Sequence, residues 1–201
     1  MKNPDGSPFK GTPEQFVQQN SENFKKAFPN VLENKNNSNI FYHGSPETFV
    51  SFDKTKFGKS DMGSLGRGNY ITESKSYAEL YAKPEGYPMI EQFKNPKGNV
   101  YELYANAPNI EKTSNLSKQQ IRNLRGKDVE NVVYGDSDYL NKGFKGNSDI
   151  VVPFSSNLKS AVGNNGMFDM TNPNIYKALV PGVIGLGAAS QIDKKEFGGN
   201  I

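Results

Sequence analysis

The chain has no cysteine and only one histidine, His43, among its 201 residues. Without cysteine it can form neither disulfides nor thiolate metal sites, and one histidine leaves few ligands for zinc. We therefore expect no bound metal ion. A chain free of cysteine is compatible with any redox compartment, so this absence does not indicate where the protein acts.

The sequence also lacks a strong net charge and a long apolar run. Its 24 basic and 21 acidic residues give a net charge of +3, which by itself is too small to indicate a nucleic acid or an anionic membrane as partner. Residues 1–5 are polar and contain no apolar core of a signal peptide, so we expect no secretion signal. The apolar segment 178–190 is shorter than a membrane span and contains one proline and three glycines, so we expect no transmembrane helix.

Length and composition suit one domain with extensions. A chain of 201 residues can bury a real hydrophobic core, and 20 glycines with 12 prolines indicate short elements joined by many loops. We expect an N-terminal lead-in with a helix over residues 1–38, a folded domain over 39–175, and an apolar or flexible tail over 176–201.

Three capping patterns predict helices, beginning at Thr12, Ser74 and Ser117. The first helix is expected to run to about residue 28 and to use as apolar contacts Phe16, Val17, Phe24 and Phe28. The second is expected to place on one face Tyr77, Leu80 and Tyr81. The third should end at Gly126.

Five segments are predicted to be strands: 39–43, 68–72, 100–105, 130–134 and 149–154. The third alternates, with Glu102 and Tyr104 on an outer face, as in a half-buried strand. No helix of crossover length separates the last two, which favours antiparallel pairing between them. Residues 30–39 are expected to form a polar linker, and the chain after residue 157 is expected to be rich in turns.

The stretch from 41 to 82 organises the chain. A strand that ends in His43-Gly44 places an imidazole at the mouth of a sheet, and the glycine lets a ligand approach the backbone closely. A glycine-flanked turn leads to Tyr70, and Tyr81 follows eleven residues later. Two tyrosine rings in this layout suit a flat ligand held between them.

These motifs carry a resemblance to a known family. In their order and spacing, His43-Gly44-Ser45, Gly66-x-Gly68-x-Tyr70 and Ser74-Lys75-Ser76 before Tyr81 resemble the NAD-binding half of the ADP-ribosyltransferases. The branch is the one with a His, a Tyr and an acidic residue, which includes poly(ADP-ribose) polymerases and diphtheria-type toxins. Asp149, followed by an apolar strand and Lys159-Ser160, is similar in particular to the ADP-ribosyltransferase domains of phage polyvalent proteins.

The resemblance covers about residues 39 to 170 and implies a fold and a site. The fold would be α+β, with a split, mostly antiparallel sheet and a few short flanking helices. The resemblance implies a catalytic triad of His43, Tyr70 and Asp149. It implies that NAD, as substrate, is bound by His43, Gly44, Ser45, Tyr70 and Tyr81. His43 would contact a ribose hydroxyl on the adenosine side, Gly44 the nicotinamide carboxamide, and Asp149 the nicotinamide ribose.

Two departures from the family pattern leave alternatives open. Most members have Glu where this chain has Asp149, which is one methylene shorter, and the acidic residues that compete for the role are Glu130, Asp136 and Asp138. The polymerases have a serine where this chain has Ala78, so Ser76 would have to supply that hydrogen bond. Lys159 and the Gly163-Asn164 turn are expected to stabilise the fold rather than to touch substrate.

The resemblance favours a toxin-like mono-ADP-ribosyltransferase that modifies a macromolecule, in the first place a host protein. The loop from Gly135 to Ser148 lies where such enzymes choose their acceptor. The alternatives are an NAD glycohydrolase, or a structural or binding module of a phage virion with a degenerate transferase fold. The expected location is the bacterial host cytoplasm or the virion.

Overall fold

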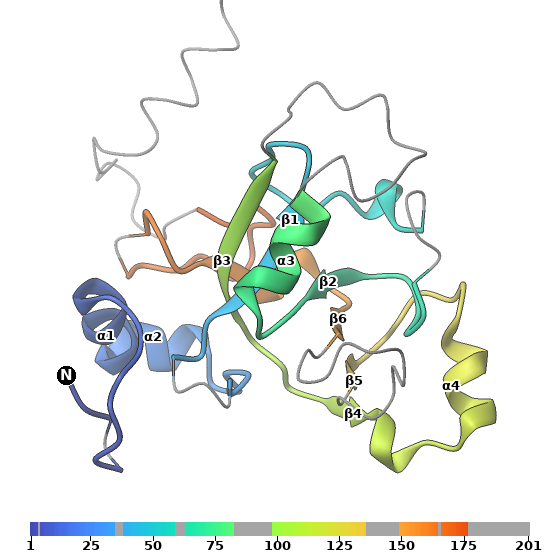
Figure 1. Cartoon of the computed structure of the whole chain (residues 1–201). Coiled ribbons are helices and arrows are strands. Elements are labelled where there is room, and N and C mark those ends of the chain that lie inside the picture. The colour runs from blue at the N-terminus through green and yellow to red at the C-terminus, as the bar shows by residue number, and fades with distance from the viewer. Residues whose placement is uncertain are drawn as a thin grey trace, which may run out of the picture.

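The computed structural model describes residues 1–3, 5–34, 38–58, 63–82, 98–135, 149–164 and 166–176. Two β-sheets form its centre (Figure 1). The first has the order β1-β3-β7, with bounds Phe41–Ser45, Asn99–Ala105 and Leu158–Ser160. The second has the order β2-β6-β5-β4, with bounds Asn69–Ile71, Asp149–Val152, Val132–Gly135 and Ile110–Lys112.

The helices are short and lie around these sheets (Figure 1). They are α1 Pro13–Asn20, α2 Glu22–Ala27, α3 Lys75–Ala82 and α4 Lys118–Leu124, with 3₁₀ turns at Lys54–Lys56, Thr113–Asn115 and Ser155–Asn157. Among the described strands every pairing is antiparallel except that of β4 with β5. The expected α+β fold with a mostly antiparallel sheet is therefore confirmed, as is the antiparallel pairing of β5 with β6. No helix among the described residues has the length and apolar character needed to cross a membrane.

The two sheets meet at one bridge between β1 and the end of β2. Tyr42 donates its N–H to the carbonyl of Thr72 at 2.8 Å, and Thr72 donates to the carbonyl of Tyr42 at 2.9 Å. Within the described part of the chain no other pair of residues bridges β1 to β2. The sheet is thus split, and the strands separate beyond Tyr42.

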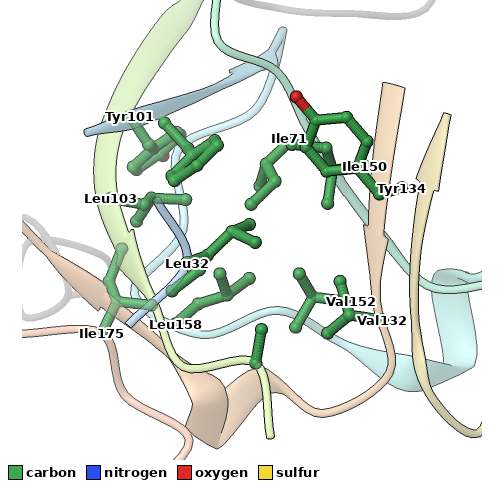
Figure 2. Close-up of a cluster of buried hydrophobic side chains, with 13 residues drawn as sticks. Leu32, Ile71, Tyr101, Leu103, Val132, Tyr134, Ile150, Val152, Leu158 and Ile175 are labelled. Atoms are coloured by element: carbon green, nitrogen blue, oxygen red, sulfur yellow. The ribbon is translucent and has the colours of Figure 1, made fainter. Parts of the chain in front are cut away.

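The main core lies between the two sheets. Figure 2 shows Tyr101 and Leu103 of β3 facing Val132, Ile150 and Val152 of the second sheet. Two further members of this cluster come from segments expected to be irregular, namely Leu32 and Ile175. Leu32 is buried, and its N–H donates to the carbonyl of Ala105 at the end of β3 at 2.8 Å. The prediction of a polar linker over residues 30–39 was wrong at this position.

A second core lies between the first sheet and the N-terminal helices. Here Phe24 of α2 and Phe28, the residue after this helix, pack on Tyr104, and Phe24 meets the Tyr104 ring edge-on with centroids 4.9 Å apart. The expected outer face of β3 is therefore buried at Tyr104, and the prediction of a half-buried strand was wrong there. The expected single helix is two, because the chain turns at Ser21, which ends α1 and caps α2. Val17, an expected apolar contact, is exposed.

The segment after residue 157 differs from its prediction as well. Instead of turns alone, residues 158–160 form β7, which pairs with the end of β3. Such a strand has only three residues and forms because β3 offers an unpaired edge, which no local pattern reveals. The predicted caps at Thr12, Ser74 and Ser117 are present. The loop expected to select the acceptor, apart from Gly135, and the tail from residue 177 lie outside the described residues.

Candidate active site

The gap between β1 and β2 leaves the outer backbone edge of Gly44 without a strand partner among the described residues. Backbone groups of successive residues in an antiparallel strand point alternately to the two sides. Tyr42 turns its N–H and C=O toward β2. Its partner on β3, Glu102, accepts at its carbonyl the N–H of Ala161, on the side of β3 that faces away from β1. Gly44, two residues after Tyr42, therefore presents its own N–H and C=O toward the gap.

His43 connects the two edges of this gap. Its Nδ1 lies 2.6 Å from the carbonyl oxygen of Tyr70, and since a carbonyl only accepts, Nδ1 carries the proton. Burial lowers the pKa of His43 to about 4, against a smaller raising effect of this hydrogen bond. The ring is therefore neutral at pH 7, and Nε2 is left as a hydrogen-bond acceptor.

Aromatic rings enclose the imidazole. Phe52 and Phe49 pack edge-on at centroid distances of 4.9 and 5.7 Å, and Tyr101 lies at 6.2 Å. Tyr101 stacks on Phe49 and accepts a hydrogen bond from its N–H at 2.8 Å. Phe49 and Phe52 also pack against the main core. Sequence reasoning did not connect these rings with His43, because only the fold brings residues 49–52 back over β1.

Tyr70 lies on β2 with its hydroxyl held by the preceding loop. The hydroxyl donates to the carbonyl of Gly66 at 2.7 Å and accepts from the N–H of Leu65 at 3.1 Å. A Cβ at Gly63 would lie 2.4 Å from this hydroxyl, and Gly63 has a positive φ of 67°. The glycine-rich loop before β2 therefore fixes the Tyr70 ring, which is partly buried.

Helix α3 packs on the face of β1 toward which a Cβ at Gly44 would point. A Cβ at Gly44 would stand 1.8 Å from the carbonyl oxygen of Ala78, so only glycine allows this approach. Near the end of α3, Tyr81 is 39% exposed, and its hydroxyl lies 3.0 Å from that of Tyr77. Ser76 is exposed at the start of the helix, with its hydroxyl 3.1 Å from that of Ser74. The position of the family's serine is filled by buried Ala78.

Asp149 lies near the gap because of strand register. In the pairing of β6 with β2, Ile71 lies opposite Ile150, so continuing this register by one residue sets Asp149, the first residue of β6, opposite Thr72. Thr72 is in turn bridged to Tyr42, the neighbour of His43. Two strand spacings, or about 10 Å, thus separate the Cα atoms of Tyr42 and Asp149.

Asp149 also shares a face of the second sheet with Tyr70. Directly opposite residues point to one side of a sheet, and residues two apart share a face. Tyr70 lies opposite Val151, so Asp149 projects on the same side as Tyr70. Among the competing carboxylates, Glu130 is exposed and precedes the first residue of β5. Gly135, the last residue of β5, pairs with Asp149. Five residues, or about 16 Å along the strand direction, therefore separate Glu130 from the position opposite Asp149. The other two competitors, Asp136 and Asp138, lie outside the described residues.

Sequence reasoning did not single out the pair Glu73 and Tyr134. The Tyr134 hydroxyl donates to Glu73 at 2.9 Å, across the strand that carries Asp149. This bond ties the end of β5 to the end of β2 and so helps to fix the start of β6 between them. The acidic residue after Thr72 was the only signal in the sequence. Ser45, the last predicted NAD contact, ends β1, and its hydroxyl accepts from the N–H of Glu47 at 3.1 Å.

The arrangement provides what cleavage of a glycosidic bond to a cationic leaving group requires. It offers a backbone donor and acceptor at Gly44, aromatic surfaces at Tyr70 and Tyr81, and a carboxylate on the adjacent strand. Such a bond passes through an oxocarbenium-like state that negative charge stabilises. The described residues contain no cluster of His, Asp or Glu suited to a metal ion.

Comparison with protein families places these features in context. The model of the family described as ADP-ribosyltransferase in polyvalent proteins matches residues 34–168, more than half of the chain. No curated protein and no solved structure matches significantly. The match contains β1, β2, α3 and β6, the elements that carry the candidate site. The chain therefore belongs to the family of ADP-ribosyltransferase domains of polyvalent proteins.

Proposed function

We propose that this protein transfers a single ADP-ribose unit from NAD to a macromolecule and releases nicotinamide. One observation carries the proposal: at the split between β1 and β2, the free backbone edge of Gly44 lies next to the His43–Tyr70 hydrogen bond, and Asp149 is two strand spacings from Tyr42. Family membership supports ADP-ribosyl transfer in general. The residue roles and the type of acceptor are our proposal.

In this reaction the bond between C1 of the ribose and the nicotinamide nitrogen breaks. Its electron pair goes to the nicotinamide ring, which leaves as a neutral molecule, so no general acid is needed. Gly44 would hold the carboxamide, with Tyr70 and Tyr81 stacked on the ring. Asp149 would bond the ribose 2′-hydroxyl and stabilise the cation that develops at C1.

His43 would act as a neutral hydrogen-bond acceptor. Because Nδ1–H is committed to the Tyr70 carbonyl, the lone pair of Nε2 can accept a ribose hydroxyl on the adenosine side. The low pKa keeps this lone pair available down to about pH 5. The acceptor nucleophile then attacks C1 and loses its proton. We propose a host protein as the acceptor, met in the bacterial cytoplasm after release from a virion.

The test is incubation of the protein with NAD labelled in the ADP-ribose half, together with a bacterial lysate. Label on a macromolecule supports transfer, free ADP-ribose supports hydrolysis, and unchanged NAD supports a structural module with a degenerate fold. Asp149→Asn should lower transfer by about 10²-fold or more, since it removes the negative charge beside the cation. Asp5→Asn, at an exposed position of the lead-in, is the matched control and should not change it. An Asp149→Asn protein with full activity would show that another carboxylate has this role.

A further inference from the structure

Positive charge is concentrated in one stretch of the chain, residues 112–127. It contains five basic residues and no acidic one: Lys112, Lys118, Arg122, Arg125 and Lys127. The rest of the chain has 19 basic and 21 acidic residues, so the net charge of +3 arises from this stretch. All five side chains belong to exposed residues, and among the described residues none of them forms an ion pair.

Three of these cations lie on one side of α4. Lys118 and Arg122 are four residues apart, and Arg125 follows three later, so at 100° per residue they fall within an arc of about 60°. They span about 10 Å along the helix, the length of about three phosphates of one nucleic acid strand. Ile121 and Leu124 face the second sheet instead, which turns the basic side outward.

The exposed residues between the cations of α4 are polar and uncharged, namely Gln119, Gln120 and Asn123. Gln119 donates to Asn123 at 2.9 Å and accepts from Arg122 at 3.0 Å on the exposed surface. The acidic residue that follows the stretch, Asp128, is already paired with Arg67 at 2.9 Å. Hence no described carboxylate neutralises the basic side of α4, and amide groups beside it can add hydrogen bonds to phosphate or sugar oxygens.

This surface lies beside the candidate site. Ile121 and Leu124 pack into the same cluster as Tyr70 and Leu65. The carbonyl of Leu124 also lies 3.2 Å from where a Cβ at Gly66 would stand, in the loop that holds the Tyr70 hydroxyl. In Figure 1, α4 stands at the edge of the second sheet, on the opposite side of the molecule from α1 and α2.

From this charge distribution we propose that residues 112–127 form a binding surface for the phosphate backbone of a nucleic acid. A row of cations without anions, set among amide side chains, matches a polyanion with regularly spaced charges. An acidic protein partner would present carboxylates at irregular spacing. We would then expect the matching basic side chains to come from several elements and not from the single stretch 112–127. The proposal concerns binding and does not depend on which macromolecule receives ADP-ribose.

The test is fluorescence anisotropy with a labelled 20-nucleotide RNA and a duplex DNA of the same length, without NAD, between 50 and 200 mM salt. We expect binding whose logarithm falls linearly with the logarithm of salt concentration. The triple variant K118Q/R122Q/R125Q should weaken binding at least tenfold. It should also reduce the slope for single strands by about 2, because each phosphate that is no longer neutralised accounts for about 0.7 of the slope. Glutamine favours helix, so α4 should be retained, which circular dichroism checks.

The matched control is K10Q/K25Q/K26Q, which removes the same charge from exposed residues of the lead-in and α2 and should leave the affinity nearly unchanged. Three results would overturn the proposal: no binding of either probe at 50 mM salt, equal weakening by the two triple variants, or equally tight binding of a polyglutamate with the charge of the RNA. NAD turnover is measured on the same proteins. Loss of nucleic acid binding with intact turnover supports a separate surface, whereas failure of the proposed function would appear as no turnover in the wild type.

Discussion

Protonation of His43 should lower the free energy of unfolding at acidic pH. Because His43 is the only histidine, one substitution separates its contribution from that of the other titrating groups. The pKa of its imidazole is lowered from its ordinary value of 6.5 to about 4 in the folded protein by burial among aromatic rings. Between these two values the unfolded chain binds the proton and the folded protein does not. The contribution of His43 to the free energy of unfolding is therefore complete above pH 6.5 and is lost as the pH falls toward 4.

The size of the effect follows from the two pKa values. Through His43 alone, the equilibrium constant for unfolding is about 30 times larger at pH 5 than at neutral pH, which corresponds to a loss of about 2 kcal/mol in the free energy of unfolding. At pH 7.5 the same factor is close to one. A loss of about 2 kcal/mol is a large share of the stability of a domain of this size, so the change is well within reach of equilibrium measurements.

The assay is urea unfolding at pH 7.5 and pH 5.0 for the wild type and for His43→Asn. Asparagine can donate its amide N–H to the Tyr70 carbonyl as Nδ1 does, but it does not titrate. The carboxylates whose pKa is lowered titrate below this window, and they are the same in both proteins. The wild type should lose about 2 kcal/mol more than the variant between the two pH values. Equal losses in the two proteins would show that the imidazole is not held neutral.

Two further substitutions test the packing around the site. Gly44→Ala would place a Cβ 1.8 Å from the Ala78 carbonyl oxygen, and the displacement of α3 should cost about 1–3 kcal/mol in urea unfolding and weaken NAD binding in calorimetry; an unchanged midpoint would refute the tight packing of α3 on β1. Lys159→Met would remove the buried ammonium group that donates to the carbonyls of Asn172 and Asn174. It should destabilise the protein by about 1–3 kcal/mol, and a variant as stable as the wild type would show that these carbonyls find other partners.

Much of the local structure was predictable because its causes lie within a few residues. The capping residues Thr12, Ser74 and Ser117 bond the first turns of their helices, as their sequence patterns indicated. The strand predicted over 68–72 contains β2, while the strand predicted over 39–43 begins and ends two residues before β1, Phe41–Ser45. The order of the family motifs indicated that His43 and Tyr70 belong to one site. The spacing between motifs was sufficient here, since β1, β2 and α3 follow one another along the chain.

The remainder depends on contacts between distant residues. Tyr104 was placed on an outer face because its strand alternates, but α2 buries it with rings 76 and 80 residues away in sequence. The aromatic enclosure of His43 and the bond between Glu73 and Tyr134 likewise join separate segments. The position of Asp149 relative to Tyr70 depends on register, which no single strand specifies on its own.

The path of the chain after β7 limits how a working fragment can be cut. The family match ends at residue 168, yet Ile175 is wholly buried in the main core and donates its N–H to the carbonyl of Val50 at 2.8 Å. A recombinant fragment trimmed to the match would remove this support from beneath the 49–52 loop, whose two phenyl rings enclose His43. It would also discard α1 and α2 and uncover Tyr104. Expression of residues 1–176 retains both flanks and is the shortest version we would take into crystallisation.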